Sequence, residues 1–187
     1  MAQAQAPGRL DLVREFINTL DVEHDTDSLS TPEGLRAWLA ERDLAQRRDV
    51  VGPEHAQRAR DLREALRELI LTNNEGGSPD PHAVASLNRI SEGLRLMARF
   101  DSRGRAAIEP ASTGVDAGLG RLLTIVHDAM TTGDWTRLKA CRSETCLWAF
   151  YDASKNRSRH WCSMDYCGAH AKARSYRERK KAAPAAG

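Results

Sequence analysis

The chain lacks the long apolar segments that mark membrane-spanning and secreted proteins. Its 187 residues contain no run of about 18 apolar side chains, the length that suggests a membrane-spanning helix. The opening residues, MAQAQAPGR, contain no apolar stretch of the kind that directs secretion. These absences predict a protein that does not bind a membrane and that resides in the cytoplasm, where cysteines stay reduced.

Aromatic side chains are also scarce. Phe, Trp and Tyr make up 5% of the chain, and six of these ten residues follow position 136. A very small domain needs such large side chains to build a core. With 41% apolar and 29% charged residues, the chain is otherwise typical of a globular protein, and it is long enough for one ordinary domain and a small module.

Catalytic signatures are missing as well. The glycine-rich stretch GVDAGLG, residues 114–120, has neither the spacing nor the Lys-Ser/Thr pair of a phosphate-binding loop. The histidines are scattered and show no i, i+4 pairing of the kind that binds a metal on a helix. No Ser-His-Asp arrangement can be singled out. We therefore expect that the protein is not an enzyme.

Helical periodicity dominates the first 134 residues. In the longest periodic segment, leucine and isoleucine form one stripe while Arg and Glu alternate on the outer face. Ser30 or Thr31 can cap the helix that follows them. A single segment alternates with period two, and the turn and strand after it would complete a β-hairpin. The expected helices cover residues 10–21, 32–43, 53–73, 81–92 and 115–132, and the hairpin covers 94–110.

All four cysteines lie near the C-terminal end, in two close pairs. Their spacing is C-x4-C, then fifteen residues, then C-x4-C. Two thiol pairs joined by a loop of this length can converge on one tetrahedral Zn²⁺ ion. In a reducing compartment such a set of cysteines binds metal more often than it forms disulfides. A disulfide pair or redox-active thiols are the alternatives to a metal site. We predict one structural zinc ion with four ligands, Cys141, Cys146, Cys162 and Cys167.

The net charge of +2 hides an uneven distribution. From Arg137 onward, 12 Lys and Arg stand against 4 Asp and Glu, which gives +8 and leaves −6 for residues 1–136. A zinc ion bound by four thiolates would add about −2 to this segment. Even so, the segment has the electrostatics of a binder of phosphate backbones, while the larger part of the chain does not.

The sequence around the cysteines predicts a strand, a turn and a basic helix. LWAFY, residues 147–151, reads as the strand, SKNRS as its turn, and RHW as a return toward the second cysteine pair, as in a zinc ribbon. The helix after Ala169 carries cations nearly all round and has no apolar face to bury. Contact with nucleic-acid phosphates would account for these charges, and a solvated basic surface is the alternative. The candidate contacts are Lys155, Arg157, Arg159, His170, Lys172, Arg174, Arg177, Arg179 and Lys180.

Several segments together resemble a known family. WTRLKAC, residues 135–141, LWAFYDASKNRSRHWCSM, residues 147–164, and the CG before the basic helix strongly resemble the CGNR zinc finger. LVREFINTLD, AWL and LREALRELI are similar to the ABATE domain, which precedes this finger in bacterial proteins. The resemblance implies a candidate stress-induced transcription regulator that binds DNA through the finger, with the four cysteines as zinc ligands.

The chain departs from this family at the motif that gives the finger its name. The motif is Cys-Gly-Asn-Arg, whereas here Cys167 and Gly168 are followed by Ala169 and His170. Both polar groups of the motif are thus absent, and His170 replaces the cation only in part because its charge is lost near neutral pH. The departure leaves the metal ligands intact and bears only on the contact with DNA.

The sequence thus predicts a mainly helical domain with a small β-hairpin, followed by a four-cysteine zinc-ribbon-like module and a basic helix. The predicted boundaries are 1–134 for the ABATE-like domain, 135–181 for the finger and 182–187 for a disordered tail. The first domain is expected to bind a small-molecule effector or to form a homodimer. DNA is the expected partner, and an adaptor that binds an acidic protein without touching DNA is the alternative.

Overall fold

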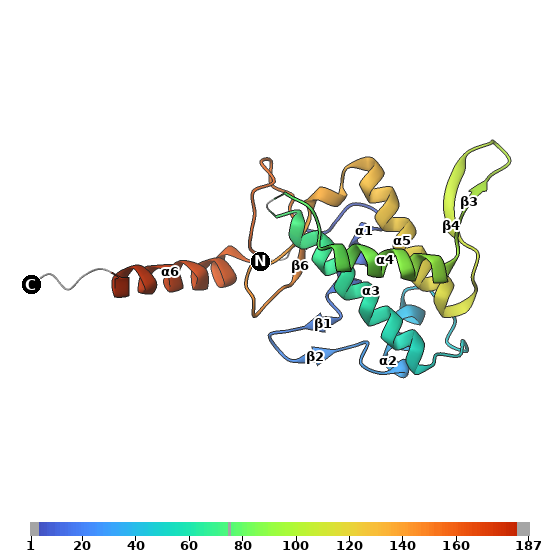
Figure 1. Cartoon of the computed structure of the whole chain (residues 1–187), viewed down its shortest axis with the longest axis horizontal. Helices are drawn as coiled ribbons and strands as arrows, with labels where there is room; N and C mark the ends of the chain where they lie inside the picture. Colours follow the sequence, from blue (N-terminus) through green and yellow to red (C-terminus); the bar gives the residue numbers. More distant parts are fainter. Residues whose placement is uncertain (1–3, 75, 183–187) are drawn as a thin grey trace, which may run out of the picture.

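Helices form most of the structure, a computed structural model that describes residues 4–74 and 76–182 (Figure 1). Five of the six described helices surround one hydrophobic core, and the sixth extends away from it. None of the helices in these residues is both long and apolar enough to span a membrane. In chain order they are α1 (Leu10–Ile17), α2 (Pro32–Glu41), α3 (Pro53–Thr72), α4 (Pro81–Leu94), α5 (Gly114–Thr132) and α6 (Ala169–Ala182).

The described strands form three separate antiparallel pairs. They pair in sequence order, so each pair is a local ribbon and no larger sheet forms from them. The pairs are β1 (Leu20–Asp21) with β2 (Thr26–Asp27), β3 (Leu96–Phe100) with β4 (Ala106–Pro110), and β5 (Leu138–Ala140) with β6 (Ala149–Tyr151). A 3₁₀ turn, η1 (Trp135–Arg137), precedes β5, and a π-helical turn, η2 (Met164–Gly168), precedes α6. The predicted fold class, helical with small strand pairs and a C-terminal cysteine cluster, is confirmed.

The first helix is shorter than the predicted 10–21. It ends at Ile17, and Leu20 lies in β1 opposite Asp27 instead of on a helical face. The Thr19 hydroxyl donates to the Phe16 carbonyl at 2.7 Å, a local bond that competes with continuation of the helix. Periodicity alone could not reveal this stop, because Leu20 falls in phase with the helical stripe.

The start of α2 settles which residue caps it. Thr31 has extended backbone angles and its Oγ1 accepts the Gly34 N–H at 3.1 Å, so Thr31 and not Ser30 is the N-cap. Gly34 itself faces the carbonyl oxygen of Ser28, where a Cβ atom would come within 2.3 Å. A larger residue at position 34 would therefore push the helix start away from the preceding loop.

The predicted hairpin is present and packs against α5. Five residue pairs join β3 and β4, from Leu96 opposite Pro110 to Phe100 opposite Ala106. Gly120 of α5 lets the ribbon approach, because a Cβ there would lie 2.7 Å from Pro110 Cβ. The far end of the ribbon leaves the body (Figure 1), and the Phe100 side chain is 73% exposed.

Two arginines of α3 lie inside the protein, against the prediction that its Arg and Glu residues alternate on the outer face. Arg63 and Arg67 are each only 2% exposed. The Arg63 guanidinium donates to both carboxylate oxygens of Asp27, at 2.6 and 2.9 Å, and so ties α3 to β2. Because a buried charge needs a partner, this bidentate pair is what makes the burial of Arg63 tolerable.

We expect Asp27→Asn to destabilise the protein in a pH-dependent way. Burial alone raises the pKa of Asp27, but hydrogen bonds from Arg63 and from the Leu29 N–H outweigh it and hold the pKa below 3.8. A carboxyl group with a lowered folded-state pKa stabilises the fold fully above its unfolded pKa, and this stabilisation is lost as the pH falls through the folded value. Urea unfolding should show a loss of about 2–3 kcal/mol at pH 7 that shrinks below about pH 4.

The control for this experiment is Asp128→Asn, which removes an exposed carboxylate from α5. Zinc release in acid affects wild type and variant alike, so their difference isolates the Asp27 carboxylate. A difference that stays constant between pH 7 and pH 3 would contradict the assignment.

The hydrophobic core does not stop at the end of α5. Leu138, Ala140, Ala149 and Tyr151, all from β5 and β6, belong to the same buried cluster as the helices. β5 packs against α3, and β6 packs against α1. A second, much smaller cluster contains the four cysteines and Phe150 with the flanking indoles of Trp148 and Trp161. The strands thus form a bridge whose one end belongs to the helical core and whose other end carries the cysteines.

Helix α6 points away from the rest of the molecule (Figure 1). From His170 to Lys181 every side chain except Ala171 is exposed. The predicted tail over 182–187 lies outside the described residues, except for Ala182, at which α6 ends.

Candidate metal centre

The first cysteine pair is held by the end of the β5–β6 ribbon. The Cys141 N–H donates to the Trp148 carbonyl at 2.9 Å, which extends the pairing of the strands by one residue. The chain then turns, and the N–H groups of Cys146 and Leu147 both donate to the Ser143 carbonyl, at 2.9 and 3.0 Å. This tight turn aims the Cys146 thiol back toward Cys141.

The second cysteine pair is held by the start of η2. Ser163 caps this turn, because its Oγ accepts the Tyr166 N–H at 3.3 Å and its carbonyl accepts the Gly168 N–H at 3.0 Å. Cys162 comes directly before the cap and Cys167 lies inside the turn. The same turn leads into α6, so the direction of the basic helix is set next to the cysteines.

The four thiols have the geometry of a tetrahedral zinc site. Their Sγ atoms all lie within 4.8 Å of one another. Cys146 and Cys162 are 3.7 Å apart, and so are Cys162 and Cys167. Four sulfurs at about 2.3 Å from one ion would be separated by about 3.8 Å, which fits. The cysteines are free, and a disulfide would need a separation of about 2.05 Å.

The pKa values of the four thiols indicate that the thiols need a dication in order to ionise together. Hydrogen bonds from Cys146 and Cys162 lower the pKa of Cys141 to about 2, and the contact with Cys141 raises the pKa of Cys146 to about 12. Contacts with Cys141 and Cys146 also raise the pKa of Cys162, and burial raises the pKa of Cys167. The thiols thus oppose one another's ionisation, and a bound Zn²⁺ ion would allow all four to ionise.

A buried ion pair fixes the loop between β6 and the second cysteine pair. The side chains of Lys139 and Asp152 are 2% and 0% exposed, and their charged atoms lie 3.0 Å apart. Lys139 also donates to the carbonyls of Arg157 and Arg159. Asp152 accepts the Arg159 N–H at 2.9 Å and both the N–H and the hydroxyl of Ser154. The whole loop from 152 to 159 is thus closed around one charge pair.

Two side chains of the helical part bind the backbone of the zinc module. The Asn18 amide donates to the Ala149 carbonyl at 2.9 Å and accepts the Ala149 N–H at 2.7 Å. The buried Arg67 guanidinium donates to the carbonyls of Leu147 and Ile17, each at 2.7 Å. Asn18, at the end of α1, thereby satisfies the free edge of β6 at Ala149, and Arg67 of α3 binds the segment just before the strand.

The C-terminal end of α3 satisfies the other strand in the same way. The Asn73 amide donates to the carbonyls of Trp135 and Leu138, at 2.9 and 2.8 Å. Asn74 donates to the Ala140 carbonyl at 2.8 Å. Sequence reasoning did not single out these anchors, because a polar side chain at a helix end reveals nothing about a partner more than 60 residues away.

Most of the candidate nucleic-acid contacts are exposed, but they occupy two different places. Lys155 and Arg157 lie on the loop that follows β6, and both are exposed. The larger group lies on α6 and its side chains are all exposed. This group consists of His170, Lys172, Arg174, Arg177, Arg179 and Lys180.

Arg159 differs from the other candidate contacts. It is only partly exposed, and its guanidinium donates to the Cys162 carbonyl at 2.9 Å. It also lies over the Phe150 ring, 5.2 Å from the centroid. These contacts give Arg159 a role in positioning the second cysteine pair, whatever else it binds.

Two family models match the chain. The ABATE model, described as "Putative stress-induced transcription regulator", matches residues 10–132, and the CGNR zinc finger model matches residues 137–180. No curated protein matches the chain. The first match alone covers more than half of the 187 residues. The chain therefore belongs to the ABATE family and carries a CGNR zinc finger, whose four cysteines are positioned to bind one zinc ion.

Proposed function

We propose that the protein is a transcription regulator that binds DNA through its zinc finger and catalyses no reaction. The observation that carries this proposal is α6, which extends from the body without an apolar face and with its cations exposed. A helix of this kind gains little from burial, and contact with phosphates would stabilise it. The family description as a regulator supports the same conclusion.

The zinc site supports this role by placing the helix. Cys167 lies two residues before the first residue of α6, and Ser163 caps the turn that joins them. A zinc ion held by four sulfurs has no open position for water or substrate, which is typical of structural sites. The metal would thus fix the direction in which the basic helix leaves the body, as a groove-binding element requires.

The proposal predicts salt-sensitive DNA binding by the zinc-loaded protein. Selection from a pool of random DNA fragments should retain specific sequences, and the Cys162→Ser variant should retain none. Each neutralised phosphate contributes a slope of about −0.9 to the plot of log affinity against log salt. If three to five cations of α6 contact phosphates, a slope of about −3 to −5 is expected. Absence of binding even at low salt would refute the proposal.

An adaptor that binds an acidic protein is the second candidate. Exposed large side chains on the zinc module favour it, since Met164 is 48% and Tyr176 63% exposed. If the protein binds polyglutamate and binds no DNA fragment at low salt, the result would favour the adaptor. Retention of DNA with a sequence preference would select the regulator.

For the helical part we propose a regulatory role, by homodimerisation or by binding an effector. In a dimer, two fingers would act on one DNA molecule, and the second would bind at a high effective concentration. Sedimentation of the full chain over a range of concentrations measures the first possibility. A monomer at all concentrations would leave effector binding as the proposed role.

A further inference from the structure

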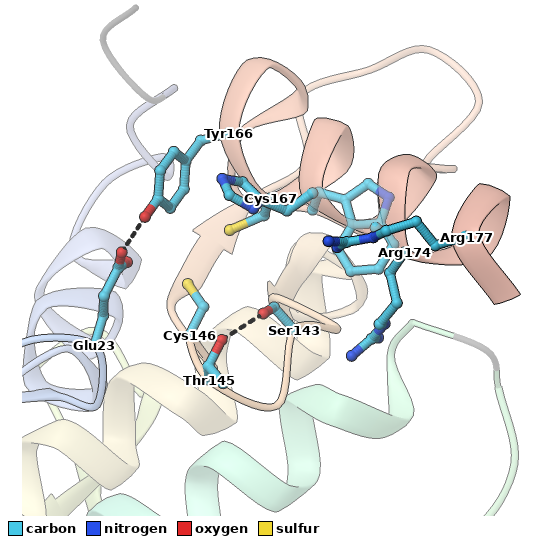
Figure 2. Close-up of a pocket in the computed structure, with 11 residues that line it drawn as sticks. Glu23, Ser143, Thr145, Cys146, Tyr166, Cys167, Arg174 and Arg177 are labelled. Atoms are coloured by element: carbon cyan, nitrogen blue, oxygen red, sulfur yellow. Dashed lines mark hydrogen bonds between the residues drawn. The ribbon is translucent and has the colours of Figure 1, made fainter.

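A small cavity separates the zinc module from the first turns of α6 (Figure 2). Its volume is about 220 Å³. The turn of Ser143 and Thr145 forms one wall, and the side chains at positions 170, 174 and 177 of α6 form another. These three positions are spaced i, i+4 and i+7, so they lie on one face of the helix. The turn of Ser143 and Thr145 and helix α6 therefore form the cavity together.

Two arginines, Arg174 and Arg177, belong to this wall. Among residues 4–74 and 76–182, no hydrogen bond or ion pair involves the guanidinium of Arg174 or Arg177. In Figure 2 both side chains extend from α6 on the side that faces the loop of Ser143 and Thr145. Some arginines of the helical part are paired, as Arg63 is with Asp27 and Arg14 with Asp11. Two unpaired guanidinium groups at one small cavity point to an anionic ligand.

The remaining walls are suited to hold such an anion. The hydroxyl groups of Ser143 and Thr145 hydrogen-bond to each other at 3.1 Å, which leaves one O–H of the pair free to donate to an oxygen atom. The rings of Tyr166 and His170 pack with their centroids 4.9 Å apart and close one side. The single carboxylate at the cavity, Glu23, already accepts the Tyr166 hydroxyl. Donors thus outnumber acceptors around the space.

The negative charge of the zinc centre is the opposing influence. Cys146 and Cys167 also line the cavity, and a zinc ion with four thiolates carries a charge of about −2. Arg174 and Arg177 therefore have two possible tasks, which are to balance the thiolates or to bind an external anion. The tasks differ in a measurable way, because only the first makes zinc retention depend on the arginines.

We propose that this cavity is a phosphate-binding subsite, and that it seats one phosphate of the DNA backbone. The inference rests on the proposed function. It identifies the place at which α6 and the turn of Ser143 and Thr145 would contact the same phosphate. Pockets for drug-sized ligands begin near 300 Å³, so a space of about 220 Å³ suits one phosphate group better than a whole nucleotide. Arg174 and Arg177 would bind its oxygens, and one hydroxyl of the Ser143–Thr145 pair would donate to it.

The test compares two variants with the same change of charge in the zinc-loaded full chain. Arg174→Gln/Arg177→Gln alters the cavity, and Arg179→Gln/Lys180→Gln alters the same helix outside it. Inorganic phosphate is titrated while the amide signal of Thr145 and the indole signal of Trp161, a further lining residue, are followed by NMR. DNA affinity is measured against salt for all three proteins, and zinc retention is measured against a chelator.

Phosphate should shift both signals in the wild type and in the control variant but not in the cavity variant. The cavity variant should lose at least about tenfold more DNA affinity than the control, and its salt slope should fall by about 1. Equal losses in the two variants, or an unchanged phosphate response in the cavity variant, would overturn the subsite. So would earlier zinc loss in that variant with its phosphate response intact, because the arginines would then only balance the thiolates.

The outcomes also separate this inference from the proposed function. A phosphate response that depends on Arg174 and Arg177, without any DNA binding, would keep the subsite as a site for free phosphate and refute DNA binding. DNA binding that the cavity variant retains as fully as the control would refute the subsite and leave the proposed function standing.

Discussion

Removal of zinc is expected to unfold the two cysteine turns, residues 141–147 and 160–168, and to abolish the proposed DNA binding, while helices α1 to α5 and the β5–β6 ribbon persist. The cluster around the cysteines contains only Phe150 and two flanking indoles besides the thiols, too little to stay folded alone. Structural zinc contributes about 10–16 kcal/mol to small fingers near neutral pH. Chelation should therefore red-shift the fluorescence of Trp148 and Trp161, whereas circular dichroism should lose little more than the signal of α6.

The matching variants are Cys162→Ser, which removes a ligand, and Glu144→Gln, which changes an exposed residue in the turn between Cys141 and Cys146. The first should behave like the chelated protein even with zinc in excess, and the second like the wild type. Dispersed NMR signals from residues 141–147 and 160–168 after complete zinc removal would show that the metal is not what holds the cysteine turns together.

Breaking the buried pair of Lys139 and Asp152 is expected to have the next largest effect. Burial alone raises the pKa of Asp152, but hydrogen bonds from Ser154, Lys139 and the backbone lower it to about 2, so the carboxylate is fully ionised at neutral pH. Asp152→Asn would leave the Lys139 ammonium in the interior without a counter-charge. Removing one partner of a buried pair costs about 3–5 kcal/mol, and denaturant unfolding of the zinc-loaded protein measures this.

An exposed pair in the same chain provides the control. Arg105 and Asp101, at the tip of the β3–β4 hairpin, are 74% and 39% exposed, and a pair of this kind contributes little to stability. The double variant Lys139→Met/Asp152→Leu should recover part of the loss, since it removes both charges together. An Asp152→Asn variant no less stable than Asp101→Asn would show that the pair does not support the loop.

Local signals in the sequence were sufficient for the helices, the hairpin and the cysteine cluster. The buried apolar residues of α3 and α5 each repeat over about four turns, and a prolyl residue after Gly52 or Asp80 marks a helix start. The cysteine spacing and the basic character of α6 are likewise local patterns. Each of these features can be recognised within a window of about 30 residues.

The remaining features depend on partners distant in the chain. Arg63 and Arg67 look like surface residues until Asp27 and the Leu147 carbonyl are placed beside them. β5 has three residues and one of them is Lys139, so its sequence has no period-two pattern that would indicate a strand. Its lysine is buried because the carboxylate of Asp152, the residue after β6, lies 3.0 Å from the ammonium group. Such pairings follow from tertiary packing, which no short window contains.

The anchoring of the finger by Asn18, Arg67, Asn73 and Asn74 restricts how this architecture can be rearranged by gene fusion. A finger cut free at residue 134 would uncover the buried Leu138 and Ala149 and leave their backbone groups without the partners supplied by α1 and α3. Grafted onto another protein, it would require a host that offers the same amides at the same places. We therefore expect the two halves to fold as one unit and not as an exchangeable cassette.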